Sequence, residues 1–397
     1  MTSSSAFRLT GPLDLTVSCA RGQVELVRRE VEALGYEVAA EHATGLSLTG
    51  TLRDAMRLDL HLRCAFRVLV ALTELAAPDG EALYRRALEL PWEELIPADG
   101  YVTVTARVDT FAVNSSMFAS LKLKDAIVDR ISEATGRRPD SGPRRTGVVI
   151  QLSWKGERCW LSLDTAGEKL SDRGYRKRAH KAPMRETLAA ACLLSAGYDG
   201  QTHLVNPMCG SGTLAIEAAL LATGRAPGLL RHDFGFRHVR PFDPVAWKEL
   251  RAEARAARRP CAARIVASDR DPKAVEVARH NARTAGVEDL IEFAVCDFAE
   301  TPLPEGGGLV ILNPEYGKRL GDREQLQATY RQIGDFFKQR CGGCTGAVFT
   351  CDLALAKAVG LRTRRRVTLY NGELEGRLLL YELYAGSKKQ RGGEDAP

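Results

Sequence analysis

Hydrophobic residues in the first part of the chain follow a pattern that predicts a small α+β unit. Leu13–Val17 alternates apolar and polar positions as a half-buried strand does, and apolar residues between Val24 and Leu34 recur at helical spacing. Gly35 then ends the helix. Four more elements are predicted on the same grounds: strands at Tyr36–Ala40 and Leu46–Thr49, a helix at Leu52–Leu62 and an apolar strand at Phe66–Leu72.

A second segment predicts another mixture of strands and helix. Tyr101–Val108 alternates as a half-buried strand, and Ser120–Ala134 carries apolar residues along one helical face. Val148–Trp154 and Cys159–Leu163 form a predicted hairpin around the turn at Lys155-Gly156.

From about Gly174 onward, strands alternate with helices. The predicted helices are Thr187–Ala196, Leu214–Thr223, Val245–Arg259 and Lys273–Ala285, and the predicted strands are His203–Asn206, Ile265–Ser268, Ile291–Val295 and Leu309–Leu312. This alternation favours an α/β domain with a mostly parallel, doubly wound sheet.

Composition limits the class of protein without deciding its function. The chain has 397 residues, enough for two or three domains, and its 45% hydrophobic and 27% charged content is typical of globular proteins. The net charge of +6 permits an anionic partner but does not require one. No apolar run approaches the roughly 20 residues of a membrane span, and the Ser-rich residues Met1–Ala6 lack the apolar centre of a signal peptide.

The ten cysteines are scattered and do not resemble a disulfide framework, so we expect a reducing cytoplasm. Cys341 and Cys344 have the spacing of a metal-binding pair. No second pair and no histidine cluster accompanies them, so we expect no metal. The tail from Ser387 is rich in lysine and glycine and is predicted to be disordered.

A glycine-rich turn follows the strand His203–Asn206 and begins a helix. Gly210 and Gly212 let the backbone approach a ligand closely, and the helix N-terminus offers unpaired N–H groups to a carboxylate or phosphate. Ala215 stands where a dinucleotide fingerprint has its third glycine, which disfavours a dinucleotide only slightly. The candidate cofactor-binding residues of this turn are Asn206, Pro207, Gly210, Ser211, Gly212 and Thr213.

Two acidic residues follow the next two predicted strands. Asp269 comes after Ile265–Ser268, where a carboxylate can accept hydrogen bonds from ribose hydroxyls. Asp297 comes after Ile291–Val295 and can accept from an adenine amino group, with Phe298 packing near the ring. Each acid alone is a common helix cap or loop residue. Together with the glycine turn, at successive strand ends, they predict an adenosine ligand with a charged tail.

The loop after the fourth predicted strand has the sequence Asn313-Pro314-Glu315-Tyr316. It differs at one position from the Asn-Pro-Pro-Tyr loop with which many methyltransferases hold an exocyclic amino group against the methyl of S-adenosylmethionine. The Asn313 side-chain oxygen and the Pro314 carbonyl can each accept one amino hydrogen, and Tyr316 would stack on the base. We expect Glu315 to point to solvent. The alternative is that it touches the target base or a nearby arginine.

In these motifs the chain resembles the THUMP-domain guanine-N2 RNA methyltransferases, and most closely the N-terminal, RlmL-type half of the large-subunit rRNA enzyme. The segments that carry the resemblance span most of the chain in order: Leu121–Asp129, Arg173–Arg176, Ala182–Ala190, Asn206–Thr213 with Ile216–Ala219, Arg225–Gly228 and Asn313–Leu320. Two residues depart from the family pattern. Asn206 stands where the family usually has Asp, and Glu315 replaces the second Pro of the loop.

The resemblance implies a ferredoxin-like segment at residues 1–52, a THUMP domain at 53–166, a Rossmann-like class I methyltransferase domain at 167–386 and a tail at 387–397. It implies S-adenosylmethionine as cofactor and N2-methylation of a guanosine in 23S rRNA, with the base flipped out of its helix. Family members with a second, fused methyltransferase domain exist, and this chain is expected to contain only one.

Basic residues near these motifs are candidates for phosphate contacts. They are Lys122 and Lys124 in the THUMP-like helix, Arg173 and Arg176 before the methyltransferase domain, and Lys318 and Arg319 after the Asn-Pro loop. Two alternatives stay open: guanine-N2 methylation of tRNA by the same architecture, and an RNA-binding or assembly factor without catalytic activity. The same loop type serves DNA adenine and protein glutamine methyltransferases, but the THUMP-like segment favours RNA.

Overall fold

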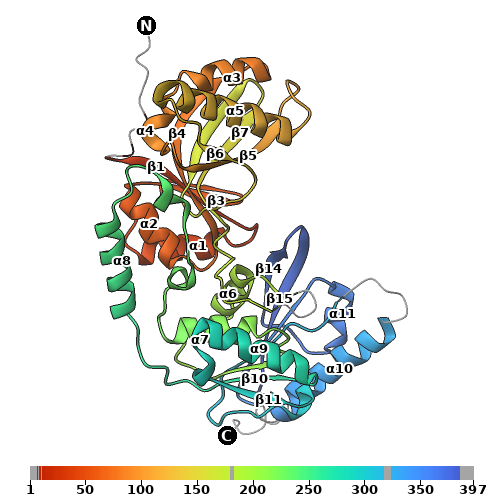
Figure 1. The fold of residues 1–397 in the computed structure, drawn as a ribbon. Coiled ribbons are helices and arrows are strands. Elements are labelled where there is room, and N and C mark those ends of the chain that lie inside the picture. The colour runs from red at the N-terminus through yellow and green to blue at the C-terminus, as the bar shows by residue number, and fades with distance from the viewer. Residues whose placement is uncertain (1–6, 8, 10, 179–182, 317–322, 385–397) are drawn as a thin grey trace, which may run out of the picture. The chain divides into compact units, whose positions relative to one another are not determined.

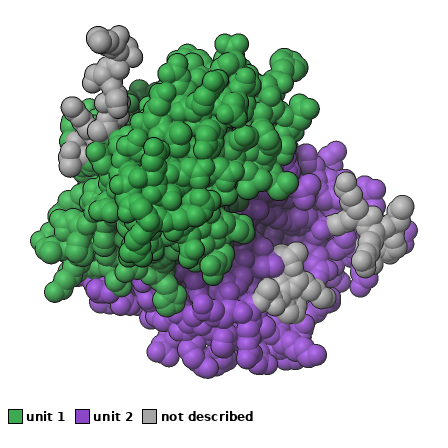
Figure 2. Space-filling view, turned by 45° about the horizontal axis from the view of Figure 1, so that its top comes forward, with its two compact units in different colours: residues 1–19, 27–172, 231–254 green, residues 20–26, 173–230, 255–397 purple. Residues whose placement is uncertain are grey.

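The computed structural model describes residues 7, 9, 11–178, 183–316 and 323–384 (Figure 1). The chain divides into two compact units (Figure 2). Unit 1 comprises residues 1–19, 27–172 and 231–254, and unit 2 comprises residues 20–26, 173–230 and 255–397. The segment 231–254 lies in sequence between two elements of unit 2, yet it packs with unit 1.

Unit 1 is built on one eight-stranded sheet with the order β2-β3-β1-β4-β8-β7-β5-β6. Its strands are β1 (Leu13–Cys19), β2 (Ala40–His42), β3 (Gly45–Gly50), β4 (Ala65–Ala76), β5 (Tyr101–Asp109), β6 (Asp140–Ser141), β7 (Val148–Lys155) and β8 (Arg158–Asp164). Its helices are α1 (Val24–Ala33, which begins in unit 2), α2 (Leu52–His61), α3 (Gly80–Leu88), α4 (Trp92–Leu95), α5 (Ser116–Thr135) and most of α8 (Pro244–Ala256).

The long strand β4 joins the two parts of this sheet. Val70 pairs with Leu15 of β1 on one side and with Leu163 of β8 on the other, and both pairings are antiparallel. The sequence pattern predicted only Phe66–Leu72 for this strand. The described strand continues to Ala76 because β8 supplies partners there that the local pattern cannot reveal.

Local signals account for most of the helix boundaries in unit 1. Thr51 begins α2 with a capping box, in which its side chain accepts from Asp54 N and the Asp54 side chain accepts from Thr51 N. Gly136 ends α5 with a φ of 71°, a left-handed conformation that glycine adopts without strain. The expected strand at Tyr36–Ala40 is wrong in its extent, because only Ala40–His42 pairs with β3. Helices α3 and α4 were not predicted, and both pack against α5.

Unit 2 is built on a seven-stranded sheet with the order β11-β10-β9-β12-β13-β15-β14. Its strands are β9 (Leu204–Pro207), β10 (Ile265–Asp269), β11 (Ile291–Val295), β12 (Leu309–Leu312), β13 (Thr345–Thr350), β14 (Arg365–Asn371) and β15 (Leu374–Glu382). The pairings from β11 to β13 are parallel, and β15 is antiparallel to both its neighbours. The prediction of a mostly parallel sheet is confirmed.

The helices of unit 2 are α6 (Glu186–Ser195), α7 (Thr213–Ala222), α9 (Pro272–Ala285), α10 (Arg323–Arg340) and α11 (Leu353–Ala358). Nearly every residue of α6 and α7 is buried, in keeping with sequences that are apolar all round. A short 3-10 turn, η4 (Phe298–Glu300), follows β11. In unit 2, the sequence pattern predicted the helices and strands up to β12 and none of those after it.

Candidate active site at the reversal of strand order

The strand order of unit 2 reverses between β9 and β12. From β9, the next strands β10 and β11 follow toward one edge of the sheet, whereas β12 and β13 follow toward the other edge. In open α/β sheets the crevice beyond the carboxyl ends of the strands at such a point is where ligands bind. The glycine-rich turn leaves β9 at this point and the Asn-Pro loop leaves β12 beside it, because Leu204 pairs with Leu309 and Val205 with Val310.

The turn between β9 and α7 has an unusual backbone. Met208, Gly210 and Gly212 have φ angles of 56°, 54° and 81°, and Met208 is the one non-glycine residue with positive φ among those described. A side chain on Gly210 would meet nothing within 4 Å, whereas a Cβ on Gly212 would lie 2.9 Å from Ala278 Cβ of α9. Gly210 therefore leaves open space next to the backbone, and Gly212 permits the close approach of α9.

Asp269 fastens this turn to the end of β10. Its Oδ2 accepts from Gly210 N at 3.0 Å and its Oδ1 accepts from Asp271 N at 3.0 Å. The side chain is half-buried. Asp269 thus lies beside the glycine turn, as its position at a strand end predicted, and it also shapes the turn before any ligand is considered.

Asn206 links the two strands at the reversal. Its side chain is 1% exposed, and its Nδ2 donates to the carbonyl of Ile311 in β12 at 2.9 Å. Its Oδ1 is buried and has no hydrogen-bond partner among the described residues. The family usually has Asp at this position, and a carboxylate could not make the donation to Ile311 O.

The Asn-Pro loop presents an unused acceptor. The Oδ1 of Asn313 is covered by surrounding atoms and has no partner among the described residues, although the residue is half-buried. Pro314 is buried and Glu315 is exposed, in line with the expectation that Glu315 points to solvent. The ring of Tyr316 lies edge-on to Phe349, with centroids 6.3 Å apart and planes at 76°. Its hydroxyl accepts from Asn371 Nδ2 at 3.0 Å, and burial raises the pKa of Tyr316.

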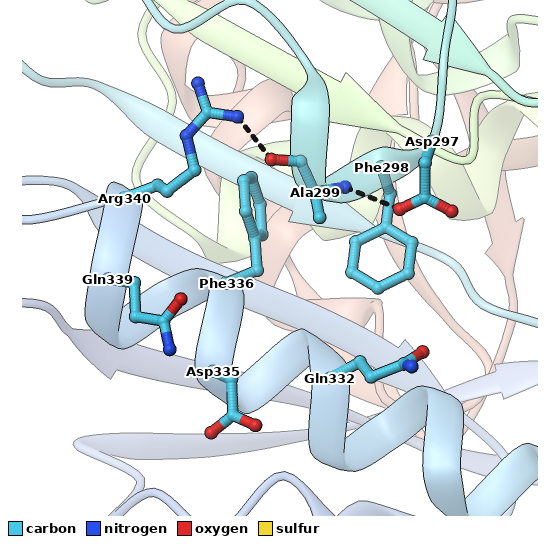
Figure 3. A pocket seen from close by; sticks show the side chains of 8 residues that line it. All are labelled: Asp297, Phe298, Ala299, Gln332, Asp335, Phe336, Gln339 and Arg340. Atoms are coloured by element: carbon cyan, nitrogen blue, oxygen red, sulfur yellow. Dashed lines mark hydrogen bonds between the residues drawn. The ribbon is translucent and has the colours of Figure 1, made fainter.

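Asp297 and Phe298 lie at the end of β11, beside a hollow of about 460 Å³ (Figure 3). Asp297 Oδ1 accepts from Ala299 N at 2.9 Å and so begins the turn η4. Phe298 is buried and packs edge-on to Phe336 of α10, with ring centroids 5.9 Å apart. The ring packs in the core and also lines the hollow, so its expected contact with an adenine ring stays a prediction.

A network of polar groups connects the glycine turn to the start of α6. Thr213 Oγ1 lies 3.3 Å from Ser211 Oγ and accepts from the guanidinium of Arg176 at 3.3 Å. The same guanidinium pairs with Glu186 at 3.2 Å. Burial raises the pKa of Glu186 to about 7, against the opposing effect of Arg176. The turn is therefore fixed to α6 as well as to β10.

Asn281 of α9 contributes to the site and was not predicted. It is fully buried, and its Nδ2 donates to Ser211 O at 3.2 Å and to Arg178 O at 3.0 Å. Asn371, which contacts Tyr316, was also missed. A polar residue on a predicted amphipathic helix, such as Asn281, gives no local signal. The strand that carries Asn371 was not predicted at all.

The residues predicted to contact RNA lie in different surroundings. Arg173 is 1% exposed and lies 3.6 Å from Glu217, and Arg176 is held by Glu186 and Thr213. Both serve the interior of unit 2, so the geometry does not support phosphate contacts for them. Two others pair with acids: Lys122 lies 3.4 Å from Glu81, and Lys124 lies 2.5 Å from Asp125. Lys318 and Arg319 lie outside the described residues.

Among the described residues, no group of three or more His, Cys, Asp or Glu side chains could hold a metal ion, and the ten cysteines are free thiols. Within the same residues, no helix is long and apolar enough to cross a membrane.

Three protein-family models match successive parts of the chain. The RlmL ferredoxin-like domain matches residues 14–69, the THUMP domain matches residues 77–164, and the RMKL-like methyltransferase domain matches residues 173–379, more than half of the chain. The chain belongs to the RMKL-like methyltransferase domain family. The glycine turn and the Asn-Pro loop both lie inside the matched methyltransferase domain.

Curated relatives carry the name ribosomal RNA large subunit methyltransferase K/L. That of Syntrophotalea carbinolica is 38% identical over 403 residues, covering 98% of this chain and 56% of the relative. That of Allochromatium vinosum is 38% identical over 368 residues, covering 90% and 50%. The chain thus spans about half the length of the curated relatives it matches.

Solved structures share the whole architecture. SMU.472, described as a methyltransferase and crystallised with SAH, has a TM-score of 0.83 and 27% identity, covering 95% of this chain and 99% of that one. A protein described as a predicted N6-adenine-specific DNA methylase from Listeria monocytogenes has a TM-score of 0.81 and 29% identity, covering 95% and 97%. The predicted fold class, a class I methyltransferase domain preceded by ferredoxin-like and THUMP regions, is confirmed.

Proposed function

We propose that this chain uses S-adenosylmethionine to methylate the exocyclic N2 of a guanosine in 23S rRNA. The observation that carries the proposal is Asn313 Oδ1, which has no partner among the described residues and lies in the loop after β12, the strand beside β9 at the reversal of strand order. A buried acceptor without a partner is costly unless a ligand supplies the donor.

The residues of the glycine turn fit the cofactor. The open space at Gly210 admits a ligand close to the backbone, and the N-terminus of the ten-residue helix α7 favours a carboxylate. Asp269 keeps lone pairs for ribose hydroxyls beyond its bonds to Gly210 N and Asp271 N. When bound, S-adenosylmethionine supplies a methyl group on a positively charged sulfur.

The acceptor residues address the weakness of the nucleophile. The N2 lone pair of guanine is delocalised into the ring, so the amine attacks poorly. Asn313 Oδ1 and the Pro314 carbonyl would each accept one amino hydrogen, and both bonds strengthen as positive charge develops on nitrogen. Tyr316 would hold the base plane. No general base is required, because the proton can leave after methyl transfer.

The substrate class rests on similarity. The THUMP match and the name of the curated relatives support RNA, and large-subunit rRNA within that class. Since the chain spans about half of those relatives, we propose that it corresponds to their N-terminal, RlmL-type half. The boundaries 1–52, 53–166 and 167–386, a cytoplasmic location, and phosphate contacts by Lys122, Lys124, Lys318 and Arg319 remain part of this proposal.

A methyl-transfer assay with radiolabelled S-adenosylmethionine tests the function. We expect label on undermodified 23S rRNA and its recovery as N2-methylguanosine. Label on tRNA, or on adenine in DNA, would replace the proposed substrate, and the second outcome matches the description of the Listeria protein. Loss of all transfer with RNA binding intact would favour a binding or assembly factor.

RNA affinity provides a separate test. Phosphate contacts release counterions, so we expect the affinity to fall steeply between 50 and 200 mM salt. An affinity that does not change with salt would remove the proposed phosphate contacts while leaving the methyl-transfer chemistry in place.

A further inference from the structure

The hydroxyl of Tyr316 accepts a hydrogen bond inside unit 2. Asn371, the last residue of β14, donates its Nδ2 to that hydroxyl at 3.0 Å. The Cys351 thiol, just after β13, interacts with the same hydroxyl, and burial raises the pKa of that thiol. The hydrogen bond from Asn371 anchors the hydroxyl end of the Tyr316 side chain to β14.

The ring of Tyr316 also packs against the protein. Phe349 of β13 is fully buried and meets Tyr316 edge-on at 6.3 Å. Gly376 on the neighbouring strand β15 leaves room for the Phe349 ring, because a Cβ at that position would lie 2.7 Å from it. Tyr316 is thus constrained at its hydroxyl by β14 and at its ring by β13.

We propose that Asn371 is a positioning residue that sets the plane of the Tyr316 ring and, through it, the orientation of the target base. This inference rests on the proposed function, since the base is the group that the ring would hold. Methyl transfer needs the attacking nitrogen in line with the donor, and a misplacement of about 1 Å can cost about 10²-fold in rate. Tyr316 cannot keep the base aligned with the methyl donor if its own ring rotates.

The competing interpretation is that Asn371 only stabilises the β14–β15 hairpin. The hairpin offers a matched control one residue away, where Tyr370 donates its hydroxyl to Glu375 at 3.0 Å. Tyr370→Phe removes a hydrogen bond of the same length from the same hairpin but touches nothing in the Asn-Pro loop. A purely structural role would give both substitutions the same effect.

The test is a double-mutant cycle in the full chain, measured as single-turnover methyl transfer to undermodified 23S rRNA. We expect Asn371→Ala and Tyr316→Phe each to lower the maximal single-turnover rate about tenfold, with little change in the RNA concentration that gives half of that rate. The double variant should match the single variants, because both changes break one hydrogen bond. Tyr370→Phe should retain the rate, and SAH affinity by calorimetry should be unchanged throughout.

Additive effects in the double variant, an unchanged rate in Asn371→Ala, or an equal loss in Tyr370→Phe would each overturn the positioning role. The ¹⁹F resonance of 3-fluorotyrosine at position 316 gives a readout that does not depend on activity. It should shift in Asn371→Ala and not in Tyr370→Phe, and an unshifted resonance would overturn the contact. If the wild-type chain transfers no methyl group, the proposed function fails; if it transfers and only the cycle fails, the positioning role alone is lost.

Discussion

The two loops at the reversal of strand order are built in opposite ways. On the β9 side, side chains fix the backbone of the glycine turn: Asp269 accepts from Gly210 N, and Asn281 donates to Ser211 O, while Asn206 Oδ1 has no partner among the described residues. On the β12 side, Asn313 Oδ1 has no partner among the described residues, and Glu315 extends to solvent. The backbone of the first loop is fixed by protein side chains, whereas the second loop offers a side-chain acceptor.

This difference suggests a division of labour. A turn whose shape is fixed by its own hydrogen bonds loses little entropy when it binds a cofactor, which is the advantage of preorganisation. An acceptor kept unpaired is ready for a group whose charge develops only in the transition state. Asn206 connects the two sides through its bond to Ile311 O, two residues before Asn313.

The largest expected effect comes from removing the unpaired acceptor. Asn313→Ala should lower kcat by on the order of 10²–10³-fold, because one hydrogen bond that strengthens in the transition state is lost. Affinity for SAH, measured by calorimetry, should stay within about twofold, since Asn313 belongs to the other loop. Equal losses in rate and in SAH affinity would erase the distinction between the two sides.

The next effect comes from the packing of the glycine turn. Gly212→Ala should destabilise the protein by about 2–4 kcal/mol, because its φ of 81° disfavours a side chain and the Cβ would crowd Ala278. Gly197 has the same φ with nothing within 4 Å, so Gly197→Ala should cost only about 1–2 kcal/mol. Urea denaturation of both variants measures the difference, and equal losses would mean that the turn tolerates crowding.

A smaller effect concerns the support behind the turn. Burial raises the pKa of Glu186 to about 7, so its contribution to stability is fully present below about 4.5 and is lost as pH rises through 7. Relative to wild type, Glu186→Gln should therefore gain stability between pH 5 and pH 8, by on the order of 2 kcal/mol. Glu276→Gln, on an exposed pair with Arg178, is the control. Parallel pH profiles for wild type and Glu186→Gln would contradict the prediction.

The smallest effect should come from the residue that departs from the usual loop. Glu315→Pro should change kcat and substrate choice by no more than about twofold, because Glu315 is exposed and both proposed acceptors belong to its neighbours. The transfer assay on 23S rRNA, tRNA and DNA measures this. A switch of substrate would instead place Glu315 at the base edge and make the β12 loop the source of specificity.

Much of the fold could be predicted from local sequence, and its limits have physical causes. Leu13–Val17 and Leu309–Leu312 were located because their burial follows a period or a short apolar run. The strands β13, β14 and β15 were not predicted. The order of elements along the chain gives no sign that the last strand, β15, is antiparallel and lies between β13 and β14.

The site was predicted to a similar degree. Asp269 beside the glycine turn, and the Asn-Pro loop next to it, follow from the rule that parallel strands end at one edge. The prediction for Arg173 does not fit the structure, because sequence cannot tell a basic residue paired in the interior from one on the surface.

By itself, the sequence determined which groups can do chemistry: two glycines in a turn, two acids at strand ends, and an Asn-Pro loop, each identifiable because residue type and spacing are local. Only the tertiary structure decided which of their atoms are free. The Asn206 amide nitrogen donates to Ile311 O and the Tyr316 hydroxyl accepts from Asn371, while Asn206 Oδ1 and Asn313 Oδ1 have no partner among the described residues. The partners lie 55 to 105 residues away, so no local pattern could have assigned them.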